Sequence, residues 1–309
     1  MTGPQVWPAP AKLNLFLHIV GRRDDGYHRL QTVFQLVDLC DRLTIEPRSD
    51  GVLERRGGLV HVPPEQDLVI RAAAVLREAA GDPALGAVIT VEKHIPEGAG
   101  MGGGSSDAAT TLVALSHLWG LHWPASRLAA LGLRLGADVP VFVHGRTAWG
   151  EGVGEELTPL TLPERWFAVI HPGIGVPTGP VFQAADLTRD SPVITIRDSV
   201  AALGALPAAG ASGEAWRGSV FGTGFRNDCE AVVTRLHPPV RAALGWLQRS
   251  GVARLTGTGA CVFGVRRNQS EAEASLAGLP PAWRGFVVRS LGETPWPTGR
   301  QGFWGVAKR

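Results

Sequence analysis

Glycines are concentrated between Gly98 and Gly104, where the sequence reads GAGMGGG and is followed by Ser105 and Ser106. An apolar, β-branched run stops at Pro96 just before this loop, and a helical pattern of leucines follows it. Each glycine costs backbone entropy on folding, so such a cluster serves little purpose in a merely structural turn. A glycine loop before a helix N-terminus presents backbone N–H groups and the positive end of the helix dipole to an anion. We therefore interpret the loop as a phosphate-binding site.

Neither of two common phosphate-binding loops accounts for this segment. A Walker A loop ends in Gly-Lys-Ser or Gly-Lys-Thr, whereas this loop ends in Gly-Gly-Ser without a lysine. The dinucleotide fingerprint GxGxxG matches from Gly98 to Gly103, but that fold needs an acidic residue about 20 positions further on. No Asp or Glu occurs between Asp107 and Asp138. The sequence thus predicts a phosphate loop of a third kind.

Lys12, Asn14 and Asp138 are the polar residues whose surroundings could support catalysis. Lys12 and Asn14 alternate with leucines in AKLNLFLHIV, so they share one face of a predicted strand, either as a solvent-facing pair or as functional groups. Asp138 lies in a short loop before the apolar run Val-Phe-Val, where burying an unpaired carboxylate is costly. It either caps or turns the chain there or takes part in catalysis.

Tyr27 and His28 end a turn that contains Asp-Gly, just before the next apolar run. Tyr27 is the only tyrosine of the chain. A histidine beside a tyrosine forms either a packed, hydrogen-bonded pair or a ligand contact, and the pattern leaves both interpretations open.

The elements that must position these residues alternate between strands and helices. Strands are predicted at residues 11–20, 30–39, 43–47, 88–91, 166–171, 252–255, 261–264 and 286–288. Helices are predicted at residues 68–80, 126–136, 227–236, 240–250 and 271–279, with one more behind the glycine loop, capped by Ser105, Ser106 and Asp107. A domain junction is expected near Leu160, and residues 201–219, rich in Ala, Gly and Ser, read as a flexible insertion. The aromatic tail, residues 294–309, suggests no function.

Composition narrows the class of protein. A chain of 309 residues predicts about two domains, and a net charge of +2 without a run of Lys or Arg argues against nucleic acid or an anionic membrane as partner. The three cysteines are far apart and odd in number, as is usual for reduced thiols rather than a disulfide framework or a zinc site. The N-terminus lacks a signal-peptide core, and no apolar run is long enough to span a bilayer. We expect a soluble, cytoplasmic protein.

Three segments, in this order and spacing, resemble the GHMP kinase superfamily: PAKLNLFLHIVGRRDDGYHRLQT, PEGAGMGGGSSDAA and RLTGTGACVFG. The AKLNLFL strand, the DGYH turn and the LGADVPVFV stretch are most similar to the members that act on a cytidine-diphosphate-linked methylerythritol in non-mevalonate isoprenoid biosynthesis. The likeness extends from Pro8 to about Leu291. It implies an α+β, two-domain fold with the active site in the interdomain cleft: a ribosomal-protein-S5-like domain over residues 1–160 and a ferredoxin-like domain over residues 161–309.

The resemblance also implies a cytoplasmic kinase that uses ATP and Mg²⁺ to phosphorylate the 2-hydroxyl of a small molecule, with no nucleic-acid or membrane partner, as a monomer or a weak homodimer. Asp138 would accept the proton of that hydroxyl, and Lys12 would keep Asp138 ionised. Candidate Mg²⁺ ligands are Ser105 and Ser106. The loop implied to hold ATP consists of Pro96, Glu97, Gly98, Ala99, Gly100, Met101, Gly102, Gly103, Gly104, Ser105 and Ser106.

The acceptor site implied by the resemblance is aromatic at one end. Tyr27 and Phe182 would stack on the cytosine, and His28 would hydrogen-bond to it. The residues implied to bind the substrate are Asn14, Tyr27, His28, Thr178, Phe182, Thr256 and Gly257.

Three other functions are weighed against this one. Another GHMP kinase, acting on mevalonate or homoserine, has no need of a stacking pair for a base. A non-catalytic nucleotide-binding regulator has no need of both Lys12 and Asp138. A dinucleotide-dependent oxidoreductase requires the ribose-binding acid that the loop lacks.

Overall fold

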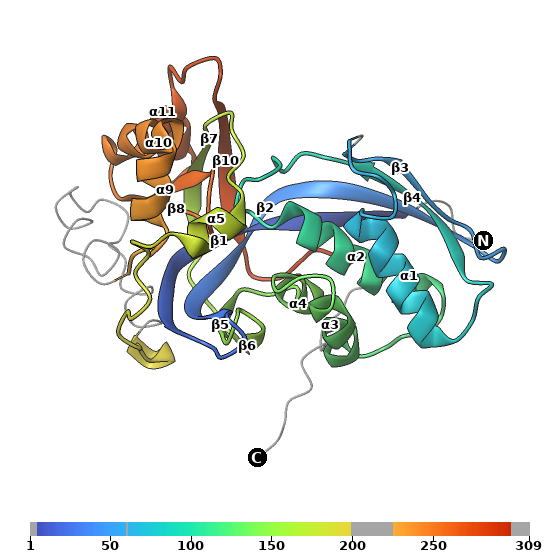
Figure 1. Ribbon diagram of the computed structural model, residues 1–309. Helices are drawn as coiled ribbons and strands as arrows, with labels where there is room; N and C mark the ends of the chain where they lie inside the picture. The colour runs from blue at the N-terminus through green and yellow to red at the C-terminus, as the bar shows by residue number, and fades with distance from the viewer. Residues whose placement is uncertain (1–4, 60, 199–224, 298–309) are drawn as a thin grey trace.

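Two long antiparallel strands, β1 (Gln5–Arg22) and β2 (His28–Arg48), form the frame of the molecule (Figure 1). The computed structural model describes residues 5–59, 61–198 and 225–297, so the predicted insertion at residues 201–219 and the end of the aromatic tail lie outside the described residues. The prediction of separate strands at residues 30–39 and 43–47 is wrong, because β2 continues through both. Between the two predicted strands, the buried Asp41 carboxylate accepts hydrogen bonds from the backbone N–H groups of His94 and Ile95.

The strands form one sheet that extends through both halves of the chain. In the described residues it has ten strands, of which β1 pairs with β2, and β5 (Ala148–Glu151) and β6 (Glu156–Pro159) continue from β2. Its path runs through β3 (Leu53–Gly57), β4 (Gly86–Glu92), β2, β10 (Arg284–Leu291), β7 (Trp166–His171), β9 (Val262–Arg266) and β8 (Ala253–Leu255). The sequence did not predict β3, because its residues, LERRG, offer almost no apolar pattern.

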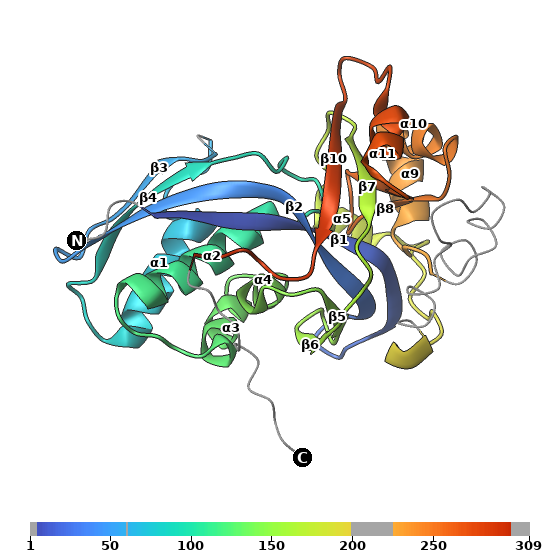
Figure 2. The same ribbon diagram turned by 180° about the vertical axis from the view of Figure 1, so that it is seen from behind.

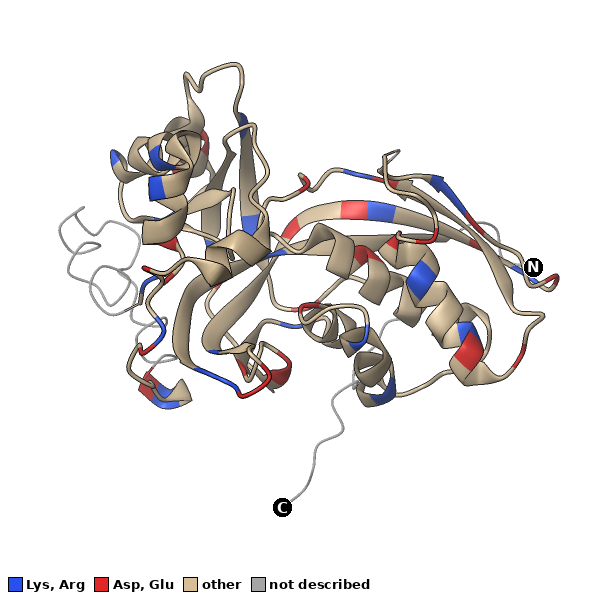
Figure 3. Cartoon of the chain, viewed as in Figure 1, with Lys and Arg blue, Asp and Glu red and all other residues tan. Residues whose placement is uncertain are grey.

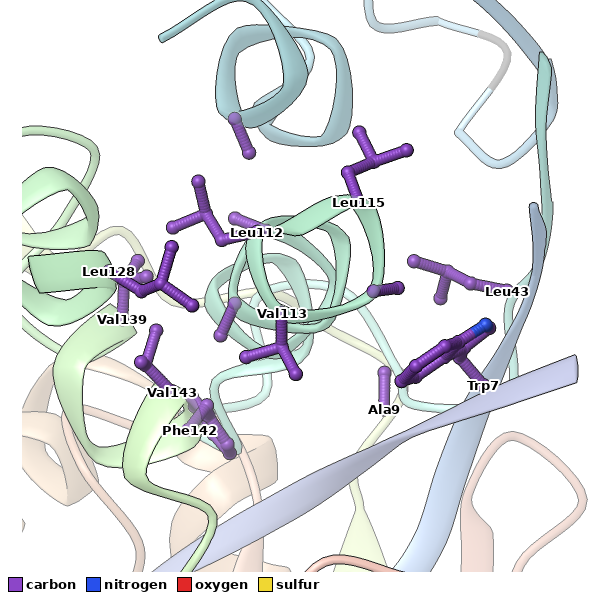
Figure 4. Packing of buried hydrophobic residues seen from close by; sticks show 14 of the residues in the cluster. Trp7, Ala9, Leu43, Leu112, Val113, Leu115, Leu128, Val139, Phe142 and Val143 are labelled. Carbon is purple, nitrogen blue, oxygen red and sulfur yellow. The ribbon is translucent and has the colours of Figure 1, made fainter. Parts of the chain in front are cut away.

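Four helices cover one face of the N-terminal strands: α1 (Leu68–Ala80), α2 (Gly103–Leu118), α3 (Ala125–Leu133) and α4 (Val139–His144). The core lies between these helices and the sheet, with α2 at its centre (Figure 4). Leu112 and Leu115 of α2 and Trp7 of β1 are fully buried there. The apolar run at residues 141–143 belongs to the short helix α4, which begins directly after Asp138.

The C-terminal half packs α9 (Glu230–Leu236), α10 (Pro238–Gln248) and α11 (Gln269–Leu276) against the strands β7 to β10, and α5 (Thr178–Gln183) lies near the middle of the molecule. The predicted break at residues 237–239 is confirmed, since His237 ends α9 and precedes Pro238, the first residue of α10. Positively and negatively charged residues are interspersed along the described chain (Figure 3). None of the described helices combines the length and hydropathy needed to cross a membrane.

The chain returns to its N-terminal half after β10, as Figure 2 shows. Residues 290 and 291 pair with β2, the N–H of Thr294 donates to the carbonyl of Gly145 at 2.8 Å, and the indole of Trp296 donates to the carbonyl of Pro8 at 3.2 Å. These hydrogen bonds from the described start of the tail therefore connect the C-terminal half of the chain to the N-terminal half. The division of the chain near Leu160 stays a prediction.

Candidate active site

The glycine loop leads directly into α2 without a side-chain cap. Gly102 occupies the N-cap position at φ +73°, and the helix begins at Gly103. The prediction that Ser105, Ser106 and Asp107 cap this helix is wrong: the left-handed glycine turns the chain into the helix earlier, so all three lie inside it. The first-turn N–H groups have no side-chain acceptor, which suits them to bind an anion.

Backbone hydrogen bonds hold the loop in place from its carbonyl side. The carbonyl of Gly98 accepts from the N–H of Ala260 at 2.9 Å, and the carbonyl of Ala99 accepts from the N–H of Cys261 at 3.1 Å. Because these carbonyls point into the protein, the opposite edge of the loop faces the cavity that it lines. The TGTGA segment, residues 256–260 in the C-terminal half, thus supports the side of the loop that faces away from the cavity.

Gly98 and Gly100 are two of the loop positions that require glycine. Gly98 and Gly100 adopt φ values of +59° and +71°, which side chains rarely adopt. A Cβ at Gly100 would lie 2.2 Å from the carbonyl oxygen of Thr256, and one at Gly98 would lie 2.9 Å from the Cα of Gly175. Close backbone approach between the two halves therefore explains these glycines.

Lys12 and Asp138 meet in the wall of the cavity. The Lys12 ammonium lies 3.4 Å from a carboxylate oxygen of Asp138; the lysine side chain is 4 % exposed and that of Asp138 is 34 % exposed. Burial excludes a solvent-facing pair for Lys12 and Asn14. Asp138 holds the N-cap position of α4 but makes no capping hydrogen bond with its side chain, so the capping interpretation is not supported.

Hydrogen bonds fix both the backbone and the side chain of Asn14. Its N–H donates to the hydroxyl of Thr256 at 3.0 Å, and its side-chain amide donates to the hydroxyl of Thr32 at 2.9 Å. Its amide oxygen accepts from the Lys12 ammonium. Asn14 therefore orients the lysine toward Asp138.

An aromatic group, formed by His28 and Phe182, lines another part of the cavity. The rings of His28 and Phe182 are stacked with centroids 5.2 Å apart, and Arg189 donates to the Nε2 atom of His28 at 3.1 Å. Burial, and then the charges of Arg189 and Arg22, lower the pKa of His28. Tyr27 is 65 % exposed, so it does not form a packed pair with His28, although both line the cavity.

A buried charged cluster lies behind the first turns of α2. The Lys93 ammonium bonds to the carboxylates of both Asp41 and Asp107, the latter at 2.6 Å. Burial raises the pKa of Asp107 to about 7; Asp41 raises it too, while Lys93 lowers it. Lys93 and Asp107 line the cavity.

A single cavity of about 1000 Å³ joins the glycine loop, the Lys12–Asp138 pair and the aromatic group. Three of the predicted residues do not line it: Met101, Ser106 and Thr256 are fully buried behind its wall. The predicted residues that line it are Lys12, Asn14, Tyr27, His28, Pro96, Glu97, Gly98, Ala99, Gly100, Gly102, Gly103, Gly104, Ser105, Asp138, Thr178, Phe182 and Gly257.

Sequence patterns did not reveal two residues that shape this site. Arg189 lies in irregular chain, where neither helical nor strand periodicity gives a signal. Asn227 donates to the carbonyls of Leu255 and Gly257, at 2.9 and 2.7 Å, and so holds the turn behind the glycine loop. The sequence predicted it only as the first residue of the helix at residues 227–236, whereas the observed helix α9 begins at Glu230.

The cavity offers oxygen atoms that fit a nucleotide-bound Mg²⁺ ion. The described residues contain no group of three or more His, Cys, Asp or Glu that could hold a metal by itself. Mg²⁺ commonly needs only one or two protein oxygens, with waters and phosphates as its other ligands. Ser105 and Asp138 line the cavity beside the loop, whereas the hydroxyl of Ser106 is buried and has no hydrogen-bond partner among the described residues.

Comparison with known proteins identifies the family. The model of the GHMP kinases N terminal domain matches residues 67–146, and that of GHMP kinases C terminal matches residues 214–280. A 4-diphosphocytidyl-2-C-methyl-D-erythritol kinase from Alkalilimnicola ehrlichii is 55 % identical over 292 residues, which cover 94 % of this chain and 92 % of the relative. This chain belongs to the 4-diphosphocytidyl-2-C-methyl-D-erythritol kinase family of GHMP kinases.

Two further proteins support this membership. The enzyme of the same name from Halorhodospira halophila is 50 % identical over 298 residues, covering 96 % of both chains. A crystal structure of a 4-(cytidine 5'-diphospho)-2C-methyl-D-erythritol kinase matches with a TM-score of 0.77 and 35 % identity, covering 93 % of this chain and 100 % of that one. These findings confirm the expected α+β, two-domain GHMP kinase fold and an ATP-dependent kinase, and they exclude the oxidoreductase.

Proposed function

We propose that this kinase transfers the γ-phosphoryl group of ATP to the 2-hydroxyl of 4-diphosphocytidyl-2-C-methyl-D-erythritol, in the non-mevalonate pathway of isoprenoid biosynthesis. The observation that carries the proposal is the single cavity that joins an anion-binding loop, a lysine–carboxylate pair and a stacked aromatic group. The names of relatives that are 50 % and 55 % identical to this chain support the same substrate.

The donor end binds the ATP phosphates through backbone groups. The N–H groups of the loop and of the first turn of α2 act as fixed dipoles, so they need no reorganisation as charge moves to the leaving oxygen. Mg²⁺, held by the phosphates with Ser105, would neutralise phosphate charge.

The reacting groups are Asp138 and Lys12. Asp138 accepts the proton of the 2-hydroxyl as the new O–P bond forms and the bond between the γ-phosphorus and the bridging oxygen breaks, releasing ADP. The Lys12 ammonium, 3.4 Å from that carboxylate, is near enough to contact the transferring phosphoryl oxygens as well. Phosphoryl transfer depends mainly on such positioning and charge stabilisation.

The acceptor end binds the cytidine diphosphate part of the substrate. Phe182 and Tyr27 offer faces for stacking on the base, and His28 offers a ring nitrogen for a hydrogen bond. Binding the base far from the hydroxyl converts remote binding energy into alignment of the reacting groups. A mevalonate- or homoserine-type acceptor has no base and would leave this aromatic group without a partner.

One experiment tests the proposal against its rivals. The purified protein is incubated with Mg-ATP and separate acceptors: 4-diphosphocytidyl-2-C-methyl-D-erythritol, mevalonate and homoserine. Mass spectrometry then detects ADP and the phosphorylated product. We expect product only with the cytidylyl acceptor; turnover of mevalonate or homoserine alone would refute the assignment. A cytoplasmic location and a monomeric or weakly dimeric state remain predictions.

A further inference from the structure

The guanidinium of Arg189 is held rigidly beside His28. Its Nη1 donates to the carbonyl of Leu187 at 3.0 Å, and its Nη2 donates to the carbonyls of Phe182 and Ala184 at 3.0 and 2.7 Å. Its Nε then donates to the Nε2 atom of His28 at 3.1 Å. Three carbonyls thus fix the direction of the one bond that reaches the histidine.

This bond determines which nitrogen of His28 carries the proton. A guanidinium has only N–H donors and no acceptor, so the Nε2 atom it contacts has to be an unprotonated acceptor. Burial and the charges of Arg189 and Arg22 lower the pKa of His28, which agrees with a neutral ring. In a neutral imidazole with a bare Nε2, the proton lies on Nδ1.

We infer that Arg189 is a specificity-determining positioning residue, which holds His28 in the tautomer that donates from Nδ1 to the base of the acceptor. The inference rests on the proposed function, because it takes the aromatic end of the cavity as the base-binding end. His28 lines the cavity, and Nδ1 has no hydrogen-bond partner among the described residues. The free donor is therefore available to a ligand.

A fixed donor at Nδ1 distinguishes cytosine from uracil. The N3 atom of cytosine is a bare acceptor, whereas N3 of uracil carries a hydrogen. The Nδ1–H donor of His28 can bond to N3 of cytosine. In uracil it faces the N3–H group, which is also a donor, and a buried donor left without a partner is costly. Sites that recognise a substrate through hydrogen bonds discriminate strongly for this reason.

Arg189 also links the histidine to the stacking ring. It donates to the backbone carbonyl of Phe182 and to the ring of His28. The planes of the His28 and Phe182 rings lie 24° apart. The stacking face and the hydrogen-bond donor therefore keep a fixed relative position. A base that stacks on Phe182 beside His28 meets the in-plane Nδ1–H donor at one edge.

Substrate discrimination tests the inference directly. We compare kcat/KM for the cytidylyl acceptor and its uridylyl analogue at saturating Mg-ATP, in the wild type and in the Arg189→Met, Arg189→Lys and Arg235→Met variants. Arg235 is the matched control, an exposed arginine that forms an ion pair with Asp186 outside the cavity.

We expect Arg189→Met to reduce the preference for the cytidylyl acceptor about tenfold or more, since one directed hydrogen bond is at stake. Arg189→Lys keeps a donor without an acceptor and should retain more of the preference than Arg189→Met. Arg235→Met should match the wild type. A folded Arg189→Met variant with the wild-type preference would overturn the inference.

Nitrogen-15 NMR of the histidine rings in the wild-type protein tests the tautomer without catalysis. The His28 signals are assigned by their loss in His28→Gln, and we expect the proton on Nδ1. A proton on Nε2 overturns the inference, even if the Arg189 variants fail to fold. If the wild type phosphorylates neither acceptor, the proposed function fails, and the NMR result still decides the tautomer.

Discussion

Replacing Gly100 by alanine should disable the glycine loop while leaving the protein folded. The new Cβ would lie 2.2 Å from the carbonyl oxygen of Thr256 and 3.0 Å from that of Gly259, at a φ of +71°. An ordinary contact needs about 3.4 Å, so the loop and the TGTGA segment must separate by about 1 Å. Both obstacles are backbone atoms, so a side-chain rotation cannot relieve the clash.

The separation breaks two backbone hydrogen bonds, and their loss contributes to the fall in the free energy of unfolding. The hydrogen bonds from Ala260 to Gly98 and from Cys261 to Ala99 contribute about 1 kcal/mol each, and the left-handed conformation costs alanine at least about 1 kcal/mol. The free energy of unfolding should therefore fall by about 3 kcal/mol. A misplacement of about 1 Å at the phosphates should lower kcat/KM for ATP about 100-fold.

Steady-state kinetics with varied ATP, together with urea unfolding, measure both quantities. The matched control is Gly245→Ala, within α10, where a Cβ meets nothing within 4 Å. It should raise the free energy of unfolding by about 0.5–1 kcal/mol, as alanine does in a helix, and leave the kinetics unchanged. If Gly100→Ala retains kcat and KM for ATP within about threefold of the wild type, the loop does not bind the phosphates as argued.

Three other substitutions test the remaining parts of the site. Asp138→Asn should lower kcat at least about 100-fold with little change in ATP affinity, as for a lost general base, and near-normal turnover would remove Asp138 from the mechanism. His28→Ala should raise KM for the cytidylyl acceptor far more than KM for ATP; equal effects would contradict the base-binding role. Because the pKa of Asp107 is raised to about 7, the native state keeps a proton that the unfolded chain releases from about pH 4 upward, so stability should fall as the pH rises toward 7 and then level off. Asp107→Asn should remove this slope in urea unfolding at pH 5 and pH 8, and an unchanged slope would show that other groups cause it.

Local patterns in the sequence determined much of the protein. The alternation in AKLNLFLHIV predicted a strand with Lys12 and Asn14 on one face, and the clustered glycines predicted an anion-binding loop before a helix. Both signals are local, because strand periodicity and the φ freedom of glycine act over a few residues. Resemblance of several short segments then indicated the family, which the comparisons confirm.

Only the tertiary structure decided which of these residues meet. Lys12 and Asp138 are separated by 126 positions, yet their charged groups lie 3.4 Å apart because β1 and the start of α4 face the same cavity. The sequence left Lys12 open to solvent exposure and Asp138 open to a capping role; burial excludes the first, and the second lacks its hydrogen bond. The cap of α2 was wrongly placed, since Gly102 turns the chain at φ +73° directly after Met101, whose carbonyl accepts from the N–H of the distant Lys12 at 3.0 Å. Long-range contacts leave no local period in the chain, and the bond between Arg189 and His28 could be found only in three dimensions.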